Sequence, residues 1–194
     1  MMAKIETWFP VAVFLENDLF PQENNEQWRD HLLNLKKTVS CGGDGWMGGT
    51  YTTHETYNLS TDKLFEPLID KITECVHEFA RAHNSFGTYK CTDSWANIAV
   101  AGNSQEFHTH DGCIFSAVYY VTSPEGSGQI VFEDPKQPDM LPLLNIQERN
   151  FLSFIRAGYT PKSGKLIIFR SYLRHLVEAG TNTDERISIS LNFK

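Results

Sequence analysis

Three histidines are the residues whose type and spacing most clearly suggest chemistry in this chain. His108 and His110 flank Thr109, and His175 follows much later. Side chains two positions apart on an extended strand point to the same side, so His108 and His110 can face one partner together. His175 can then complete one face of a metal ion. The sequence therefore predicts a metal site with His108, His110 and His175 as its ligands.

Asp111 leaves the third ligand open. Non-haem Fe(II) sites commonly use two histidines and one carboxylate. If His108 faces the metal, His110 does so too, and Asp111 points away unless a local bulge turns it inward. Strand alternation favours His110, and Asp111 is the alternative third ligand. Three imidazoles include no anionic ligand, so we expect such a site to accept nickel, copper or zinc more readily as well.

Arg186 and Ser188 form a candidate anion anchor. They are two positions apart near the C-terminus and share one face of a predicted strand. A guanidinium can hold a carboxylate through two parallel hydrogen bonds, and a buried arginine is rare unless it is paired. A metal at one end and a carboxylate anchor at the other suit a ligand with two acidic ends, such as 2-oxoglutarate. These residues therefore indicate an Fe(II)-dependent oxygenase that uses 2-oxoglutarate as co-substrate.

Composition narrows the class of protein. The chain has 194 residues and a formal net charge of -7, which fits one domain over residues 1–194 and argues against a nucleic-acid binder. The start lacks the pattern of a secretory signal, and no run approaches the roughly 20 apolar residues of a membrane span. The cysteines form no CxxC pair. We therefore expect a cytoplasmic protein with reduced thiols and without a nucleic-acid or membrane partner.

The elements that must position these residues are mainly strands. Apolar spacing predicts two helices, at 24–37 and 61–83, within a support region over 1–86. A strand at 7–14 precedes them, and its exposed edge could pair across a homodimer. A jelly-roll core over 87–194 would follow, because short Val-, Ile-, Phe- and Tyr-rich segments separated by turn signals predict strands. These segments are 88–100, 106–110, 113–122, 128–133, 149–155, 164–170, 174–179 and 185–193.

An ordered set of motifs resembles a known family. The set consists of Trp95-Ala96-Asn97, His108-Thr109-His110, SAVYYV (116–121), Glu133-Asp134-Pro135, SGKLIIFRSYLRH (163–175) and RISISLNF (186–193). It is similar to the 2-oxoglutarate- and Fe(II)-dependent oxygenases of the prolyl-hydroxylase-like superfamily, and most similar to a bacterial and phage branch with an HxH motif. With the opening WFPVAVFLENDLF, the resemblance spans nearly the whole chain. Asp111, Ala117 and Arg170 replace the Pro, Gly and Pro usual in that branch. The first of these departures leaves open whether His110 or Asp111 is the third metal ligand.

The resemblance implies a double-stranded β-helix, a cupin-like jelly roll, with iron at its open end and two N-terminal helices packed on one sheet. It implies that Arg186 pairs with the distal carboxylate of 2-oxoglutarate, assisted by Ser188. By position, Tyr120 is similar to the tyrosine that hydrogen-bonds the co-substrate in related hydroxylases. Asn97, on the neighbouring strand, could reach the site or serve as a structural amide. Dioxygen would hydroxylate an unidentified protein residue or small molecule, with release of succinate and CO₂, and no catalytic side chain beyond the metal centre is required.

Two other functions fit parts of the pattern. One is a non-catalytic cupin-like module that binds a metal or a small acid. The other is an oxygenase with three-histidine iron that works without 2-oxoglutarate, such as a thiol dioxygenase. The Arg186-x-Ser188 pair discriminates between these functions, because a module that binds only a metal has no need of a carboxylate clamp. The thiol dioxygenase would have a small buried pocket and no role for Arg186.

Overall fold

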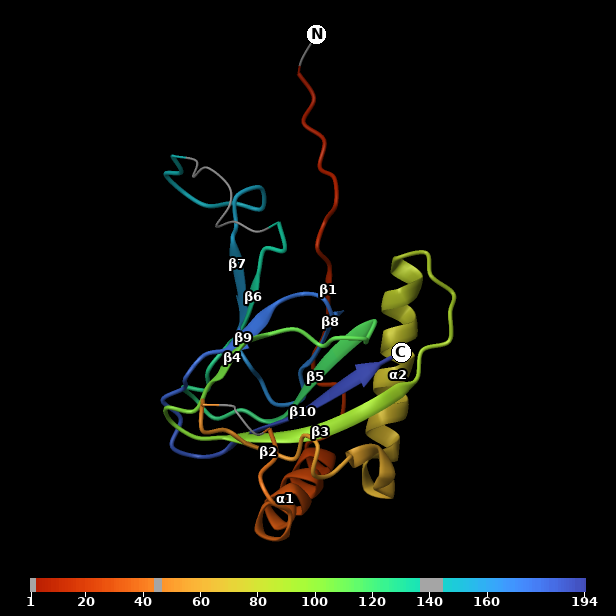
Figure 1. Ribbon diagram of the computed structural model, residues 1–194, viewed down its shortest axis with the longest axis vertical. Coiled ribbons are helices and arrows are strands. Elements are labelled where there is room, and N and C mark those ends of the chain that lie inside the picture. Colours follow the sequence, from red (N-terminus) through yellow and green to blue (C-terminus); the bar gives the residue numbers. More distant parts are fainter. Residues whose placement is uncertain (1–2, 44–46, 137–144) are drawn as a thin grey trace.

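The computed structural model describes residues 3–43, 47–136 and 145–194, and its central elements are two antiparallel β-sheets (Figure 1). The major sheet has the strand order β1-β8-β5-β10-β3-β2, and the minor sheet has the order β4-β9-β6-β7. The helices are α1 (Gln22–Thr38) and α2 (Glu66–Ala82). The strands are β1 (Val13–Glu16), β2 (Tyr51–Thr52), β3 (Cys91–Ala99), β4 (Gln105–His108), β5 (Phe115–Thr122), β6 (Ile130–Glu133), β7 (Arg156–Tyr159), β8 (Leu166–Arg170), β9 (His175–Val177) and β10 (Arg186–Phe193).

Both helices cover one face of the major sheet (Figure 1). Trp28 and Leu32 of α1 and Ile72 and Phe79 of α2 are buried in one apolar core together with Ile189 of β10. Helical spacing places these apolar residues on the inward face of each helix, and their burial supplies most of the stability of such a layer. The prediction of a mainly β fold with two N-terminal helices on one sheet is confirmed.

The alternating sequence of β10 separates the core from the interior of the jelly roll. Ile187, Ile189, Leu191 and Phe193 are buried in the core under the helices. Because neighbouring strand residues point to opposite faces, the intervening positions face the space between the two sheets. These are Arg186, Ser188, Ser190 and Asn192, all of which line one cavity. One strand therefore serves both the stability of the fold and the construction of the site.

The predicted strand at 7–14 is wrong over most of its length. β1 begins at Val13 and pairs with β8 from Val13↔Phe169 to Glu16↔Leu166, whereas residues 7–12 are not in a strand. Phe9 has a positive φ of 60°, which interrupts an extended backbone. Pro10 has no N–H to donate to a ladder. These two residues explain why pairing begins only after them.

The predicted strand at 149–155 is also wrong, and β7 begins at Arg156 instead. Asn150 holds this segment in a turn: its side chain accepts a hydrogen bond from the Leu152 N–H at 2.9 Å, and its carbonyl accepts one from the Ser153 N–H at 2.8 Å. The Ser153 hydroxyl in return accepts one from the Asn150 N–H at 2.8 Å. Such local bonds compete with a sheet ladder, so the apolar residues here do not form a strand.

The start of the second helix differs from the predicted residue 61. Residues Leu59–Thr61 and Lys63–Phe65 form two 3₁₀ turns, and α2 follows at Glu66. The Asp62 side chain caps the second turn by accepting a hydrogen bond from the Leu64 N–H at 2.9 Å. Pro67 then sits in the first turn of α2, where its missing N–H has no helical partner to lose.

The first 86 residues also contribute to the major sheet. β1 and β2 form its two edges, so this part of the chain supplies strands as well as helices. Neither helix in the described part of the chain has the length and apolar character needed to cross a membrane.

Candidate metal centre and co-substrate cavity

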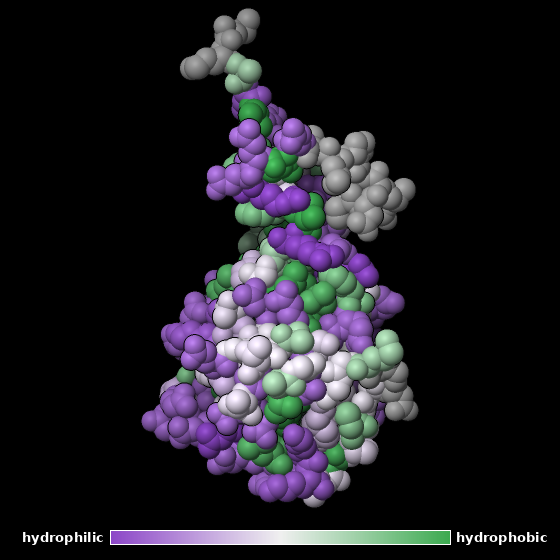
Figure 2. Space-filling view, turned by 90° about the vertical axis from the view of Figure 1, so that its left-hand side faces the viewer, coloured by the Kyte–Doolittle hydropathy of each residue, from purple (hydrophilic) through white to green (hydrophobic). Residues whose placement is uncertain are grey.

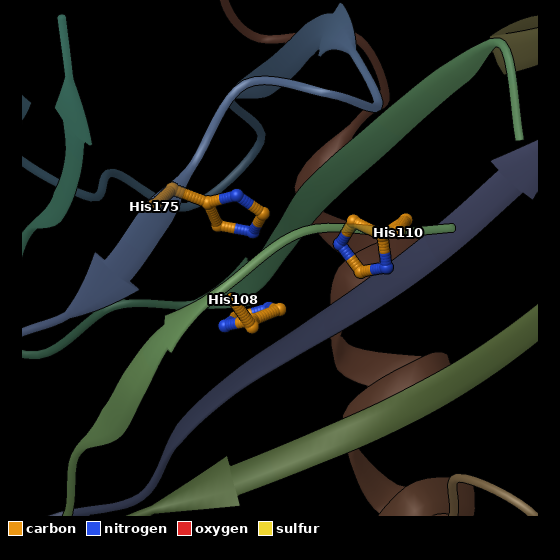
Figure 3. Close-up of side chains that lie close together, drawn as sticks. All are labelled: His108, His110 and His175. Atoms are coloured by element: carbon orange, nitrogen blue, oxygen red, sulfur yellow. The ribbon is translucent and has the colours of Figure 1, made fainter. Parts of the chain in front are cut away.

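His108, His110 and His175 converge at one end of the minor sheet (Figure 3). His108 ends β4 and pairs directly with His175, the first residue of β9. The ring centroids of His108 and His175 are 4.2 Å apart, and the His110 ring lies 5.2 Å from each of them. One potential ligand nitrogen from each ring lies within 4.8 Å of the others. The three predicted ligands are therefore brought together with a spacing that fits a single metal ion.

Backbone contacts select the tautomer of two of these rings. The Nδ1 atoms of His108 and His175 lie 2.7 Å and 2.9 Å from the carbonyl oxygens of Glu106 and Leu173. A carbonyl can only accept a hydrogen bond, so each Nδ1 must carry the proton and donate it. Nε2 is then the nitrogen that carries the lone pair, and the carbonyls fix the ring orientation.

Burial keeps the three imidazoles neutral, which is the form that binds metals. Loss of hydration, with a smaller contribution from the neighbouring histidines, lowers the pKa of both His110 and His175 to about 3. The pKa of His108 is lowered for the same main reason. The three rings can therefore bind a metal ion as uncharged nitrogen ligands, without first having to release protons.

Asp111 lies at the rim of the same cavity but not in the histidine cluster. It is exposed, and its Oδ1 accepts a hydrogen bond from the Thr109 hydroxyl at 3.1 Å. Among the described residues, the group of potential ligand atoms contains His110 in its place. This geometry supports the histidine alternative for the third ligand.

A cavity of about 280 Å³ lies between the two sheets and joins the histidines to the candidate anion anchor. Arg186, Ser188, Tyr120 and Asn97 all line it. Their placement follows from sheet register, since Ser188 of β10 lies opposite Asn97 of β3 and Tyr120 of β5. The minor sheet thus supplies the metal end of the cavity, and the major sheet supplies the opposite wall.

Arg186 is 2% exposed and has an unsatisfied donor. Its Nη1 donates a hydrogen bond to the Gly128 carbonyl at 3.1 Å, but its buried Nε has no partner in the described part of the chain. An unmade hydrogen bond of this kind costs about 1–3 kcal/mol, and more when the group is charged. A carboxylate in the cavity would supply both the missing acceptor and the missing negative charge.

Tyr120 and Asn97 differ in how their polar groups are engaged. Burial raises the pKa of Tyr120 to about 12, against a smaller lowering by Arg186, so the phenol stays protonated and can donate a hydrogen bond. The Asn97 amide already donates to Ser190 Oγ at 3.1 Å and accepts from Gln105 Nε2 at 3.3 Å. These contacts tie β3 to β10 and β4, which favours the structural role for Asn97.

The cavity wall also includes residues that the sequence analysis missed. His54 lines it, with its ring 4.7 Å from that of Trp95 and its Nε2 3.8 Å from an Asp93 carboxylate oxygen. Asn192 lines the wall beyond Ser190. Alternation along β10 was a signal that could have found Asn192. No local pattern marks His54, because it reaches the cavity only through the loop that follows β2.

Comparison with known families decides the class of protein. Residues 93–192, about half of the chain, match the family described as "Putative 2OG-Fe(II) oxygenase". The chain belongs to this family. The matched segment contains all the candidate ligand and anchor residues named above. No curated protein matches the sequence.

Solved structures of other proteins share the fold of this 2OG-Fe(II) oxygenase. A Pseudomonas putida prolyl-4-hydroxylase is 12% identical with a TM-score of 0.68, over 95% of this chain and 93% of that one. HygX from Streptomyces hygroscopicus with iron bound is 14% identical with a TM-score of 0.64, over 94% and 82%. A Trichoplax adhaerens prolyl hydroxylase in complex with a hypoxia-inducible factor peptide is 16% identical with a TM-score of 0.63, over 93% and 82%. The predicted double-stranded β-helix is thereby confirmed.

Proposed function

We propose that this oxygenase hydroxylates a C–H bond of a protein residue or a small molecule, with His108, His110 and His175 holding Fe(II) and Arg186 holding the far carboxylate of 2-oxoglutarate. One observation carries the proposal: a buried guanidinium with an unsatisfied Nε lines the same cavity as three converging imidazoles. A metal-binding module without a co-substrate would have no use for that buried charge.

The donor set fits Fe(II). Imidazole nitrogen is a common ligand for iron, and three ligands on one face leave positions for a chelating oxo-acid and dioxygen. The cavity of about 280 Å³ continues from the histidines to Arg186, so one elongated dicarboxylate can reach both ends. When bound, iron and 2-oxoglutarate supply the oxidative chemistry, in which dioxygen is consumed, succinate and CO₂ are released, and the substrate gains a hydroxyl group.

The chain's own residues bind and orient the co-substrate. The guanidinium of Arg186 would neutralise the distal carboxylate, and the hydroxyls of Tyr120 and Ser188, which line the same cavity, would donate hydrogen bonds to it. Ile130 and Phe169 provide apolar wall that limits the entry of water. No proton-transferring pair of side chains is needed for this role.

The decisive experiment adds Fe(II) and then 2-oxoglutarate to the protein without oxygen. We expect a weak visible charge-transfer band from the chelated oxo-acid, followed by succinate formation once oxygen is admitted. Folded, iron-loaded protein that gives neither the band nor succinate would contradict the proposal. Iron binding without the band would instead favour the metal-binding module.

A further inference from the structure

An exposed apolar surface, here called the apolar patch, lies away from the histidine cluster. It consists of two short runs: Ile5, Trp8, Phe9 and Val11 of the N-terminal segment, and Phe151, Leu152, Phe154 and Ile155 ahead of β7. Trp8, Phe9 and Phe151 are 71%, 83% and 78% exposed. The N-terminal segment and the β6–β7 hairpin project from the body in the same direction (Figure 1), and hydrophobic side chains show on the projection (Figure 2).

An open groove of about 570 Å³ lies between these two runs. Residues 6–11 form one wall, residues 151–152 and 154–156 form much of the other, and Phe132, Tyr159 and Leu173 also line it. The groove and the exposed runs therefore form one continuous surface, with both a hollow and projecting aromatic side chains.

The size of the patch exceeds what a monomer normally leaves uncovered. At about 150–250 Å² for each aromatic side chain, the exposed fractions of Trp8, Phe9, Phe151 and Phe154 amount to roughly 400–700 Å². The four aliphatic residues add to this area. The largest apolar patch on a typical monomer is about 300–600 Å², whereas each partner of a stable complex buries about 800 Å². The patch is thus of the size that a dimer interface requires.

The N-terminal segment lacks internal support for its conformation. In the described part of the chain, no backbone–backbone hydrogen bond involves residues 3–12. Phe9 has a φ of 60°, which is uncommon for a bulky residue and persists where surrounding contacts hold it. Both features indicate that another surface covers this segment.

We propose that the covering surface is the apolar patch of a second copy of this chain, related by a two-fold axis. A two-fold interface places one surface against itself, so it needs a hollow and a matching projection on the same surface, and the patch has both. Acidic and basic residues both line the groove, among them Glu6, Asp134, Lys136 and Arg156, so the two copies can meet without an excess of like charges.

The groove shares a wall with the metal cavity. The Phe132 ring, which lines the groove, lies 5.7 Å from the His175 ring and 4.8 Å from the Phe169 ring. The second copy would therefore pack directly behind the wall that supports one metal ligand. The dimer is independent of the hydroxylase proposal, since it rests on surface contacts outside the cavity.

Sedimentation velocity and light scattering on the full chain test this inference. Interfaces of this size have dissociation constants that range from micromolar to picomolar. At roughly 10 µM chain, which exceeds such constants, the wild type is expected to be a dimer. Trp8→Glu and Phe154→Glu should each make it monomeric, because each buries a charge in the apolar contact. Both residues are largely exposed, so circular dichroism should show an unchanged fold. Phe86→Glu is the matched control, since Phe86 is 78% exposed but outside the groove.

Three outcomes would overturn the inference. A monomeric wild type at this concentration would assign the patch to a partner of another kind, such as an extended apolar peptide. A dimer that persists unchanged in both Trp8→Glu and Phe154→Glu would place the contact on another surface. Equal disruption by Phe86→Glu would show a general effect of added charge.

Discussion

The two ends of the cavity are built in different ways. The metal end comes from the minor sheet, where His108 and His175 sit at strand ends and are held by backbone carbonyls two residues away. The anchor end comes from the major sheet, where Arg186 begins a long strand that is buried on both faces. The metal end is thus a local construction of three rings, whereas the anchor end is continuous with the core of the fold. This contrast predicts that substitutions at the two ends separate metal binding, co-substrate binding and stability.

The largest effect is expected from His175→Ala at the metal end. Removing a ligand should lower Fe(II) affinity by more than the roughly 10–100-fold seen when only a partner of a ligand is removed. The free energy of unfolding of the metal-free protein should change much less. Competition with a chelator measures the affinity. His83→Ala is the control, because His83 contacts the Phe79 carbonyl at 2.8 Å outside the cavity; equal losses in both variants would contradict the assignment.

His110→Ala and Asp111→Ala test which of the two residues is the third ligand at the metal end. If three imidazoles bind the metal, His110→Ala should cause a loss close to that of His175→Ala, and Asp111→Ala should keep nearly wild-type Fe(II) affinity. The reason is that Asp111 is exposed and bonded to Thr109, outside the histidine cluster. Titration of both proteins with Fe(II) decides between the ligands. The reverse order of effects would show that Asp111 turns inward to bind the metal.

At the anchor end, Arg186→Met should weaken 2-oxoglutarate binding by about 2–5 kcal/mol, because the co-substrate carboxylate would be left buried and unpaired. Fe(II) binding should persist. Stability without co-substrate should hold or rise, since the variant removes a buried charge with an unsatisfied Nε. Anaerobic titration measures the affinity for 2-oxoglutarate, and thermal unfolding measures the stability. Arg81→Met is the control, because Arg81 is exposed. Unchanged 2-oxoglutarate affinity would remove the basis for the anchor.

The smallest effects are expected from two adjacent tyrosines on opposite faces of β5. Tyr120→Phe should weaken 2-oxoglutarate binding by about 0.5–1.5 kcal/mol, the usual net value of one hydrogen bond, with little change in stability. Tyr119→Phe should lower the stability with little change in 2-oxoglutarate binding, because the Tyr119 hydroxyl donates to Asn25 Oδ1 at 2.7 Å in the helix-covered core. The same titration and unfolding measurements apply. Loss of co-substrate affinity in Tyr119→Phe alone would reverse the assignment of the two faces.

Local periodicity explains which features could be predicted from sequence. Alternation in RISISLNF correctly places Ile187 and Ile189 in the core and the residues between them in the cavity. The same rule predicted that His108 and His110 share one side, and their rings do converge, although β4 ends at His108 and His110 follows it outside the strand. The prediction of strands failed at residues 7–14 and 149–155, where apolar residues suggested them. There a positive φ at Phe9, the missing N–H of Pro10 and the turn bonds of Asn150 prevented pairing.

The sequence by itself determined the residue types of the site, the faces on which they lie and the family to which the chain belongs, because these depend on side-chain chemistry and on the two-residue period of a strand. Only the tertiary structure decided that β9 pairs with β4, so that His175 meets His108, and that the Nε of Arg186 is buried without a partner. It alone placed His54 in the cavity wall and left the N-terminal segment uncovered. These outcomes depend on contacts between segments far apart in the chain, which no local pattern encodes.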